Sequence, residues 1–178
     1  MDLTEKTLES REVYRGRILR VREDRVLLPN GQEAQREIVE HPGGVGILAL
    51  DADGCAVMVR QYRYPMACEL LELPAGKIDP GETPDACAAR ELEEETGYRA
   101  SKLEFLGDIY PIAAYCCEVV HLYLAKGLTR GAQHLDPDEF LDVLHVDFDE
   151  ALSRVLAGEL PDSKTQIGIM KAALLRRK

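Results

Sequence analysis

Four glutamates lie among the five residues from Glu91 to Glu95. Residues three and four apart share one face of a helix, so Glu91, Glu94 and Glu95 would converge there. Glu93 would point elsewhere. Like charges at this spacing destabilise an isolated helix by roughly a few tenths of a kcal/mol per pair unless a cation lies among them. A hard divalent ion such as Mg²⁺ suits such a patch because it takes oxygen ligands. The alternative interpretation is a solvated acidic helix face, the commoner explanation of an arbitrary run of this kind.

The residues around the glutamates predict a helix from about 84 to 96. Thr83 followed by Pro84 is typical of a helix N-terminus, and Gly97 of the position just past a C-terminus. We expect its apolar side to be formed by Ala86, Ala89 and Leu92 or their neighbours.

A glycine-containing loop precedes this helix. It holds Gly76, the Asp79-Pro80 turn and Gly81. Glycine lets backbone groups approach a bound ion or phosphate closely. The loop therefore favours the metal-site interpretation over the solvated face.

The remaining elements predict an α/β protein in which helices pack around a mixed sheet. Alternating residues from 12 to 40, around a turn at 28–32, indicate a small antiparallel sheet that precedes the main domain. This division separates an N-terminal strand region, residues 1–40, from a main domain, residues 41–178. The main domain should hold a hairpin around Asp51–Gly54, strands at 68–73, 102–110, 117–124 and 140–146, and helices at 148–158 and 162–178.

Composition excludes several classes of function. The 178 residues carry a formal net charge of −10 and no basic stripe, which opposes nucleic acid binding. No apolar run reaches the ~18 residues of a membrane span and the start of the chain lacks a signal peptide pattern, so we expect a cytoplasmic protein. The five cysteines lack a CxxC spacing, which indicates neither a zinc site nor a disulfide framework. We expect most of them to be buried.

The loop and helix together resemble the Nudix box, Gx5Ex7REUxEExGU with U aliphatic. The matching residues are Gly76, Glu82, Arg90, Glu91, Leu92, Glu94, Glu95 and Gly97. Tyr98 stands at the last aliphatic position, a conservative apolar change. Segments 60–64, 71–79, 121–128, 136–143 and 162–169 extend the resemblance to the ADP-ribose pyrophosphatase branch. This resemblance implies the Nudix α/β/α sandwich and a small N-terminal sheet that forms a homodimer.

The resemblance also implies a reaction and a metal. Nudix enzymes hydrolyse nucleoside diphosphates linked to another group, here ADP-ribose or a related ADP-sugar, to AMP and a sugar phosphate. Mg²⁺, or alternatively Mn²⁺, would neutralise the bridging oxygens and help activate water. The implied metal ligands are Glu91, Glu95 and the backbone carbonyl of Ala75. Glu94 would bind directly or through water.

Further residues receive roles from the same resemblance. Arg90 and Glu82 would orient the metal-binding carboxylates through ion pairs. Glu139, in the loop at 136–140, would be the catalytic base, with an ordinary acidic turn residue as the equal alternative.

Three residues are candidates for substrate binding: Arg60, Glu72 and Glu118. The planar guanidinium of Arg60 suits a phosphate or the terminal ribose, although a surface salt bridge is the alternative. Glu72 would contact adenine or ribose, or else serve strand packing. At the selectivity position of this branch Pro111 is followed by Ile112 where a glycine is usual, which bears on the terminal-ribose pocket.

Two other functions compete with ADP-sugar hydrolysis. One is hydrolysis of another nucleotide sugar or of a dinucleotide. The other is a catalytically silent nucleotide-binding regulator, which would have no need of clustered carboxylates. A panel of nucleotide diphosphates with Mg²⁺ would separate these functions.

Overall fold

The computed structural model describes residues 1–176. The chain forms two compact units. Unit 1 holds residues 1–43 together with 110–119, and unit 2 holds residues 44–109 together with the chain from 120 onward. Each unit is described by itself below.

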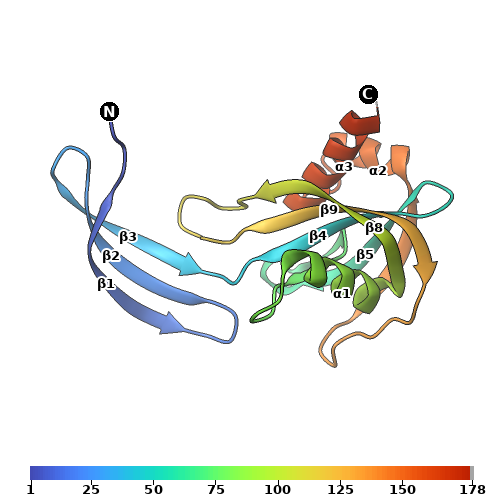
Figure 1. Cartoon of the computed structure of the whole chain (residues 1–178), viewed down its shortest axis with the longest axis horizontal. Helices are drawn as coiled ribbons and strands as arrows, with labels where there is room; N and C mark the ends of the chain where they lie inside the picture. The colour runs from blue at the N-terminus through green and yellow to red at the C-terminus, as the bar shows by residue number, and fades with distance from the viewer. Residues whose placement is uncertain (177–178) are drawn as a thin grey trace. The chain divides into compact units, whose positions relative to one another are not determined.

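Unit 1 is built on a small antiparallel sheet. Its strands are β1 (Lys6–Arg15), β2 (Arg20–Leu27) and β3 (Glu33–Glu40), in the order β1-β2-β3 (Figure 1). Gly31, with φ of +83°, lies in the predicted turn between β2 and β3. The predicted sheet is confirmed, although it begins at Lys6 and so earlier than residue 12.

A distant segment completes unit 1. The amide of Val39 donates to Tyr115 O at 2.7 Å, and the amide of Cys117 donates to Val39 O at 3.0 Å. These hydrogen bonds attach residues 110–119 to β3, although more than seventy positions separate them along the chain. For this reason β9 begins at Val120, whereas the sequence predicted a strand from 117 to 124.

Unit 2 contains a seven-stranded sheet. The strands β10, β5, β4, β9 and β8 lie side by side in that order, β6 pairs with β5, and β7 pairs with β4. Only the β4–β9 pair among the described pairs is parallel, so the sheet is mixed, as predicted. The strand bounds are β4 (Gly44–Leu50), β5 (Cys55–Arg63), β6 (Cys68–Glu72), β7 (Ala75–Lys77), β8 (Tyr98–Ile109), β9 (Val120–Arg130) and β10 (Leu141–Asp147).

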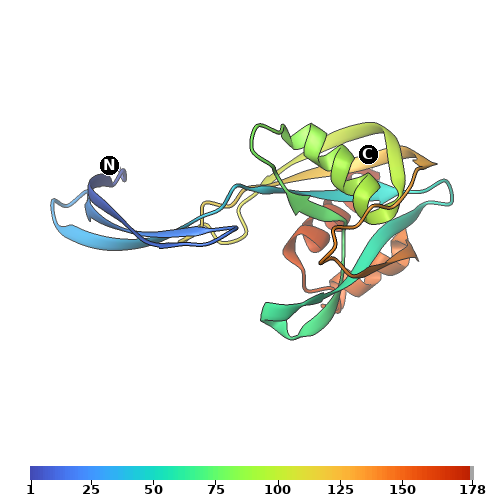
Figure 2. The ribbon, with the colours of Figure 1, turned by 90° about the horizontal axis from the view of Figure 1, so that it is seen from below.

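Three α-helices cover the two faces of this sheet. They are α1 (Pro84–Thr96), α2 (Phe148–Leu156) and α3 (Ser163–Arg176), and a 3₁₀ turn spans Tyr64–Met66. Figure 2 shows α1 on one side of the sheet and α2 and α3 on the other. Alternate residues of β4 serve both layers: Ile47 packs in the core with Leu92 of α1, and Leu48 packs in the core with Ile169 of α3. The α/β/α sandwich is confirmed.

Three smaller observations complete the fold. Ala86 and Ala89 of α1 are exposed, so the predicted apolar side is wrong for them; Cys87, Ala88 and Leu92 are buried instead. Cys87 is also the one buried cysteine in the described chain, contrary to the expectation for most of the five. None of the helices within residues 1–176 is long and apolar enough to cross a membrane.

Candidate active site

Both ends of α1 are fixed by local chemistry. The Thr83 hydroxyl accepts a hydrogen bond from the amide of Ala86 at 3.3 Å, and Pro84 occupies the first turn. Gly97 ends the helix with φ of +68°. A Cβ at Gly97 would also lie 3.1 Å from the amide nitrogen of Gln133, so both the backbone conformation and this tight contact favour glycine. The acidic helix thus begins and ends at the predicted residues.

Arg90 neutralises part of the acidic face. It donates to Glu82 at 2.8 and 2.9 Å, to Glu91 Oε1 at 2.7 Å and to Glu94 Oε2 at 2.8 Å. The hydrogen bonds from Arg90 to Glu82 are the largest cause that lowers the pKa of Glu82, to about 2. A single guanidinium therefore joins the loop residue Glu82 to two glutamates of the helix. Glu93 points elsewhere, as predicted, and pairs with Arg99 at 2.6 Å.

Glu91 and Glu95 are buried carboxylates, only 8% and 3% exposed. Burial raises the pKa of Glu91 and raises that of Glu95 to about 8, and the charge of Glu139 acts in the same direction on both. Glu95 Oε2 accepts a hydrogen bond from the amide of Ala75 at 2.9 Å. A Cβ on Gly76 would lie 1.8 Å from the carboxyl carbon of Glu91, so glycine makes room for that carboxylate.

These groups fit a hard cation by their chemistry. Anionic oxygens crowded in a desolvated place are stabilised by a divalent ion, and Mg²⁺ prefers such ligands. Within residues 1–176, however, no three His, Cys, Asp or Glu side chains are already arranged to hold a metal. Arg90 holds Glu91 and Glu94 through one nitrogen, and the Ala75 amide holds Glu95, so metal binding by these three carboxylates stays a prediction.

The loop that carries Glu139 is tied to the end of α1. The amide of Gly131 donates to Gly97 O at 2.7 Å, and that of His134 donates to Glu94 O at 2.9 Å. The Gln133 side chain donates to Glu95 O at 2.7 Å. Sequence reasoning missed Gln133 and His134, and no local pattern marks them because their partners lie almost forty residues earlier.

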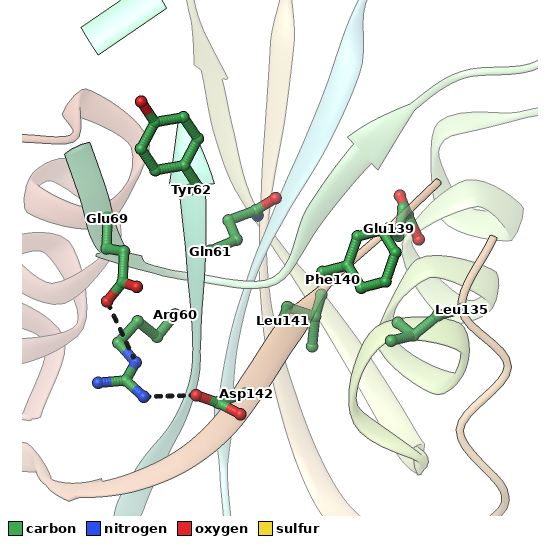
Figure 3. A pocket seen from close by; sticks show the side chains of 9 residues that line it. All are labelled: Arg60, Gln61, Tyr62, Glu69, Leu135, Glu139, Phe140, Leu141 and Asp142. Atoms are coloured by element: carbon green, nitrogen blue, oxygen red, sulfur yellow. Dashed lines mark hydrogen bonds and ion pairs between the residues drawn. The ribbon is translucent and has the colours of Figure 1, made fainter. Parts of the chain in front are cut away.

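Glu139 and Arg60 line one cavity of about 410 Å³ (Figure 3). Arg60 Nη2 lies 2.5 Å from Asp142 Oδ2, and Arg60 Nε lies 3.8 Å from Glu69 Oε2. Glu139 is exposed, and its Oε2 accepts a hydrogen bond from the amide of Asp136 at 3.3 Å. The complete lining is Arg60, Gln61, Tyr62, Glu69, Leu135, Glu139, Phe140, Leu141 and Asp142. The structure thus brings together the predicted base and one predicted substrate residue.

The other two candidate substrate residues have different surroundings. Glu72 is 1% exposed, receives two hydrogen bonds of 2.8 Å from Arg63 and is paired with Lys164. Burial raises its pKa, but these two cations outweigh burial and hold the pKa below its ordinary value. Glu118 belongs to unit 1, where it lies 3.5 Å from His41 Nδ1. Contact of either residue with substrate stays a prediction.

Comparison with known proteins identifies the family. The model of the NUDIX domain matches residues 40–166. The chain belongs to the Nudix family. A second model, the nucleoside diphosphate sugar hydrolase N-terminal domain, matches residues 5–39. The family predicted from the box at Gly76–Gly97 is therefore confirmed.

Relatives cover almost the whole Nudix chain. It is 43% identical to the methanol dehydrogenase activator of Bacillus methanolicus, over 93% of this chain and 90% of that protein. It is 40% identical to the ADP-ribose pyrophosphatase of Bacillus subtilis (strain 168), over 99% and 98% of the two chains. A crystal structure of an ADP compounds hydrolase shares the fold, with a TM-score of 0.87 at 21% identity over 99% and 97% of the chains. The protein is thus a Nudix hydrolase, as predicted.

Proposed function

We propose that this Nudix hydrolase cleaves the pyrophosphate bond of ADP-ribose or a related ADP-sugar and releases AMP and a sugar phosphate. The observation that carries this function is the buried pair of Glu91 and Glu95, whose charges are crowded by Glu139 beside a cavity. A silent binding domain would have no use for so costly an arrangement. The match of the nucleoside diphosphate sugar hydrolase N-terminal domain supports a nucleotide-sugar substrate.

Glu91, Glu95 and the carbonyl of Ala75 would hold Mg²⁺ or Mn²⁺, with Glu94 bound directly or through water. When bound, the ion neutralises the pyrophosphate oxygens and lowers the pKa of a bound water. Arg90 orients Glu91 and Glu94 through its two hydrogen bonds to them. The Ala75 amide fixes the carboxylate of Glu95 in the same way.

Glu139 and Arg60 would act from the cavity. A water oxygen forms the new bond to phosphorus, the bond to the bridging oxygen breaks, and Glu139 accepts the proton that the water loses. The guanidinium of Arg60 would bind a substrate phosphate or the terminal ribose in exchange for Asp142 and Glu69. A half-exposed ion pair of this kind is weak enough to be exchanged.

The choice of ADP-ribose rests on relatives named for that activity, from Bacillus subtilis at 40% identity and Mycobacterium tuberculosis at 39%. Relatives named GDP-mannose pyrophosphatase match at about 30% identity, which keeps other nucleotide sugars as the alternative. Pro111 followed by Ile112 marks the position where the sugar preference would be decided.

A substrate panel tests this function. Purified protein with Mg²⁺ would be given ADP-ribose, ADP-glucose, GDP-mannose and a dinucleotide, and released nucleoside monophosphate would be measured. We expect ADP-ribose to give the highest kcat/KM and EDTA to abolish turnover. A preference for GDP-mannose would select the alternative substrate.

A second candidate function is regulation of another enzyme. The relative from Bacillus methanolicus is named as an activator of a dehydrogenase and matches at 43% identity. Absence of turnover on every nucleotide of the panel, together with retained nucleotide binding, would favour this regulatory function. If the protein does hydrolyse a nucleotide, hydrolysis would be its chemistry whether it serves to break down the substrate or to regulate another enzyme.

The same proposal includes the division of the chain into an N-terminal region, residues 1–40, and a hydrolase domain, residues 41–178. It also includes a homodimer that forms through the N-terminal region. The exposed strand β1 and the match of a separate N-terminal family model to residues 5–39 support it. The cytoplasmic location stays a prediction.

A further inference from the structure

The segment Glu72–Ala75 is held by other parts of unit 2 at every residue. Glu72 binds Arg63 of β5 and Lys164 of α3. The amide of Leu73 donates to the Thr165 hydroxyl of α3 at 2.9 Å, and Pro74 O accepts from Ile47 of β4 at 2.9 Å. The last residue, Ala75, donates to Glu95 of α1. Together these four consecutive residues form hydrogen bonds or ion pairs with β5, α3, β4 and α1.

Thr165 is the buried centre of the attachment to α3. Its side chain is 0% exposed. The Thr165 hydroxyl donates to Asp162 Oδ2 at 2.6 Å and accepts from the amide of Leu73, so it acts as donor and acceptor at the same time. Asp162 Oδ2 also accepts from the amide of Thr165 at 2.9 Å. The start of α3 therefore presents one oriented hydroxyl to one buried backbone amide.

Lys164 and Gly168 of α3 further restrict where the segment Glu72–Ala75 can lie. The Lys164 amine is paired with Glu72 and with Asp162 Oδ1. Its aliphatic carbons lie 3.5 Å from the Cβ position of Gly46, the strand partner of Ala75. A Cβ at Gly168 would lie 2.7 Å from Leu73 Cδ1, so α3 also packs tightly against Leu73.

We propose that Thr165, oriented by Asp162, is a positioning residue for the active site: it fixes Leu73, and through Pro74 it fixes Ala75 and thereby the Glu95 carboxylate. This inference rests on the proposed function, because it assigns Ala75 and Glu95 to the metal site. Only Pro74 separates Leu73 from Ala75, and trans peptides hold neighbouring Cα atoms about 3.8 Å apart, so a displaced Leu73 displaces Ala75. Outer groups that orient metal ligands typically matter by roughly 10–100-fold in metal affinity or activity.

The test compares three variants of the full-length protein. Thr165→Val removes the hydroxyl at nearly constant volume, and Thr165→Ser restores it. Thr129→Val is the matched control, because the Thr129 hydroxyl also forms a hydrogen bond with a backbone group, donating to Arg99 O, but does so on an exposed part of β9. The measurements are amide hydrogen exchange in EDTA and the Mg²⁺ dependence of ADP-ribose turnover.

In the metal-free protein we expect Thr165→Val to speed exchange of the Leu73 and Ala75 amides while the Leu124 amide is unchanged. We expect the Mg²⁺ concentration at half-maximal rate to rise by roughly 10-fold or more in Thr165→Val. Thr165→Ser should return both quantities toward the wild type, and Thr129→Val should leave them there. If Thr165→Val does not fold, Asp162→Asn takes its place, with the same changes expected.

A lower melting temperature with unchanged Ala75 exchange and unchanged Mg²⁺ dependence would overturn the proposal and leave Thr165 as a structural residue only. Failure of the wild type to hydrolyse any nucleotide would count against the proposed function. The exchange comparison in EDTA would still decide whether Thr165 holds Leu73 and Ala75, so the two failures are distinguishable.

Discussion

Burial raises the pKa of Glu95 to about 8, and the negative charges of Glu91 and Glu139 add to this effect. Its Oε2 is held by the Ala75 amide, whereas Arg90 is committed to Glu82, Glu91 and Glu94. A carboxylate so desolvated, and without an ion pair to any residue from 1 to 176, is costly to keep charged. A bound divalent ion would remove that cost, which is the physical reason for proposing Glu95 as a metal ligand.

Glu95→Gln should therefore abolish most activity with little loss of stability. The amide keeps the shape of the side chain but removes a ligand charge and the repulsion from its neighbours. We expect the melting temperature in EDTA to stay constant or to rise, and turnover to fall at every Mg²⁺ concentration. Near wild-type turnover at saturating Mg²⁺ would rule out Glu95 as a metal ligand.

Glu139→Gln should lower kcat by roughly 10²–10⁴-fold, the usual range for general acid–base catalysis. Substrate affinity in the presence of Mg²⁺ should change little, because Glu139 lies on an exposed loop and is not required to bind the ion. The informative measurement is turnover against pH together with substrate affinity. An unchanged rate would exclude Glu139 as the base, and a collapse of Mg²⁺-dependent affinity would make it a ligand.

Among the elements, α1 depends on the loop before it. Glu82 of that loop holds Arg90 through two hydrogen bonds, and Arg90 in turn holds Glu91 and Glu94. The Glu82–Arg90 ion pair therefore ties the loop to the helix. It stabilises the fold and also orients Glu91 and Glu94. This arrangement follows the order of the box along the chain, which is why the sequence predicted it.

Glu82→Gln should destabilise the protein at neutral pH in a way that disappears in acid. Its folded pKa, lowered to about 2 by Arg90, lies below the ordinary 4.5 of the unfolded chain. The stabilisation is therefore complete above pH 4.5 and is lost as the pH falls toward 2, amounting to at most about 3 kcal/mol.

Unfolding free energies from denaturant titrations in EDTA, between pH 7 and pH 3, would measure this difference. Glu37→Gln is the control, because Glu37 is exposed and forms no ion pair within the described chain. The wild type and the Glu82 variant should converge as the pH falls. A gap that stays constant over this range would mean that the carboxylate charge of Glu82 is not the source of the stability.

For the whole molecule, the two hydrophobic core clusters within residues 1–176 contain no residue of the N-terminal sheet. Every residue of β1 is exposed, including Leu8, Val13 and Tyr14. An edge strand with exposed apolar side chains, such as β1, favours association with a second copy.

We expect a homodimer by light scattering at micromolar concentration and a monomer after Tyr14→Glu, which places a charge on β1. Glu37→Gln again serves as the control and should stay dimeric. A wild-type monomer with full ADP-ribose turnover would show that dimerisation is not needed for activity.

Features that depend on neighbours along the chain were decided by the sequence alone. Thr83, Pro84 and Gly97 set the ends of α1 because capping acts within one helical turn. Gly54, with φ of +82°, closes the predicted hairpin for the same local reason. The spacing from Gly76 to Gly97 identified the family, since those residues meet through one loop and one helix. The buried side of α1 was predicted only in part, because the sheet beneath decides it.

Features that join distant parts of the chain were decided only by the tertiary structure. Glu72 meets Lys164 across ninety-two positions, and the Leu73 amide meets the Thr165 hydroxyl across the same interval. Residues 110–119 join unit 1 through Val39. Such contacts leave no periodic trace in the sequence, because each partner is an ordinary residue of its own strand or helix until folding buries them together. The sequence therefore predicted which residues carry the chemistry, and the tertiary structure decided which residues hold them in place.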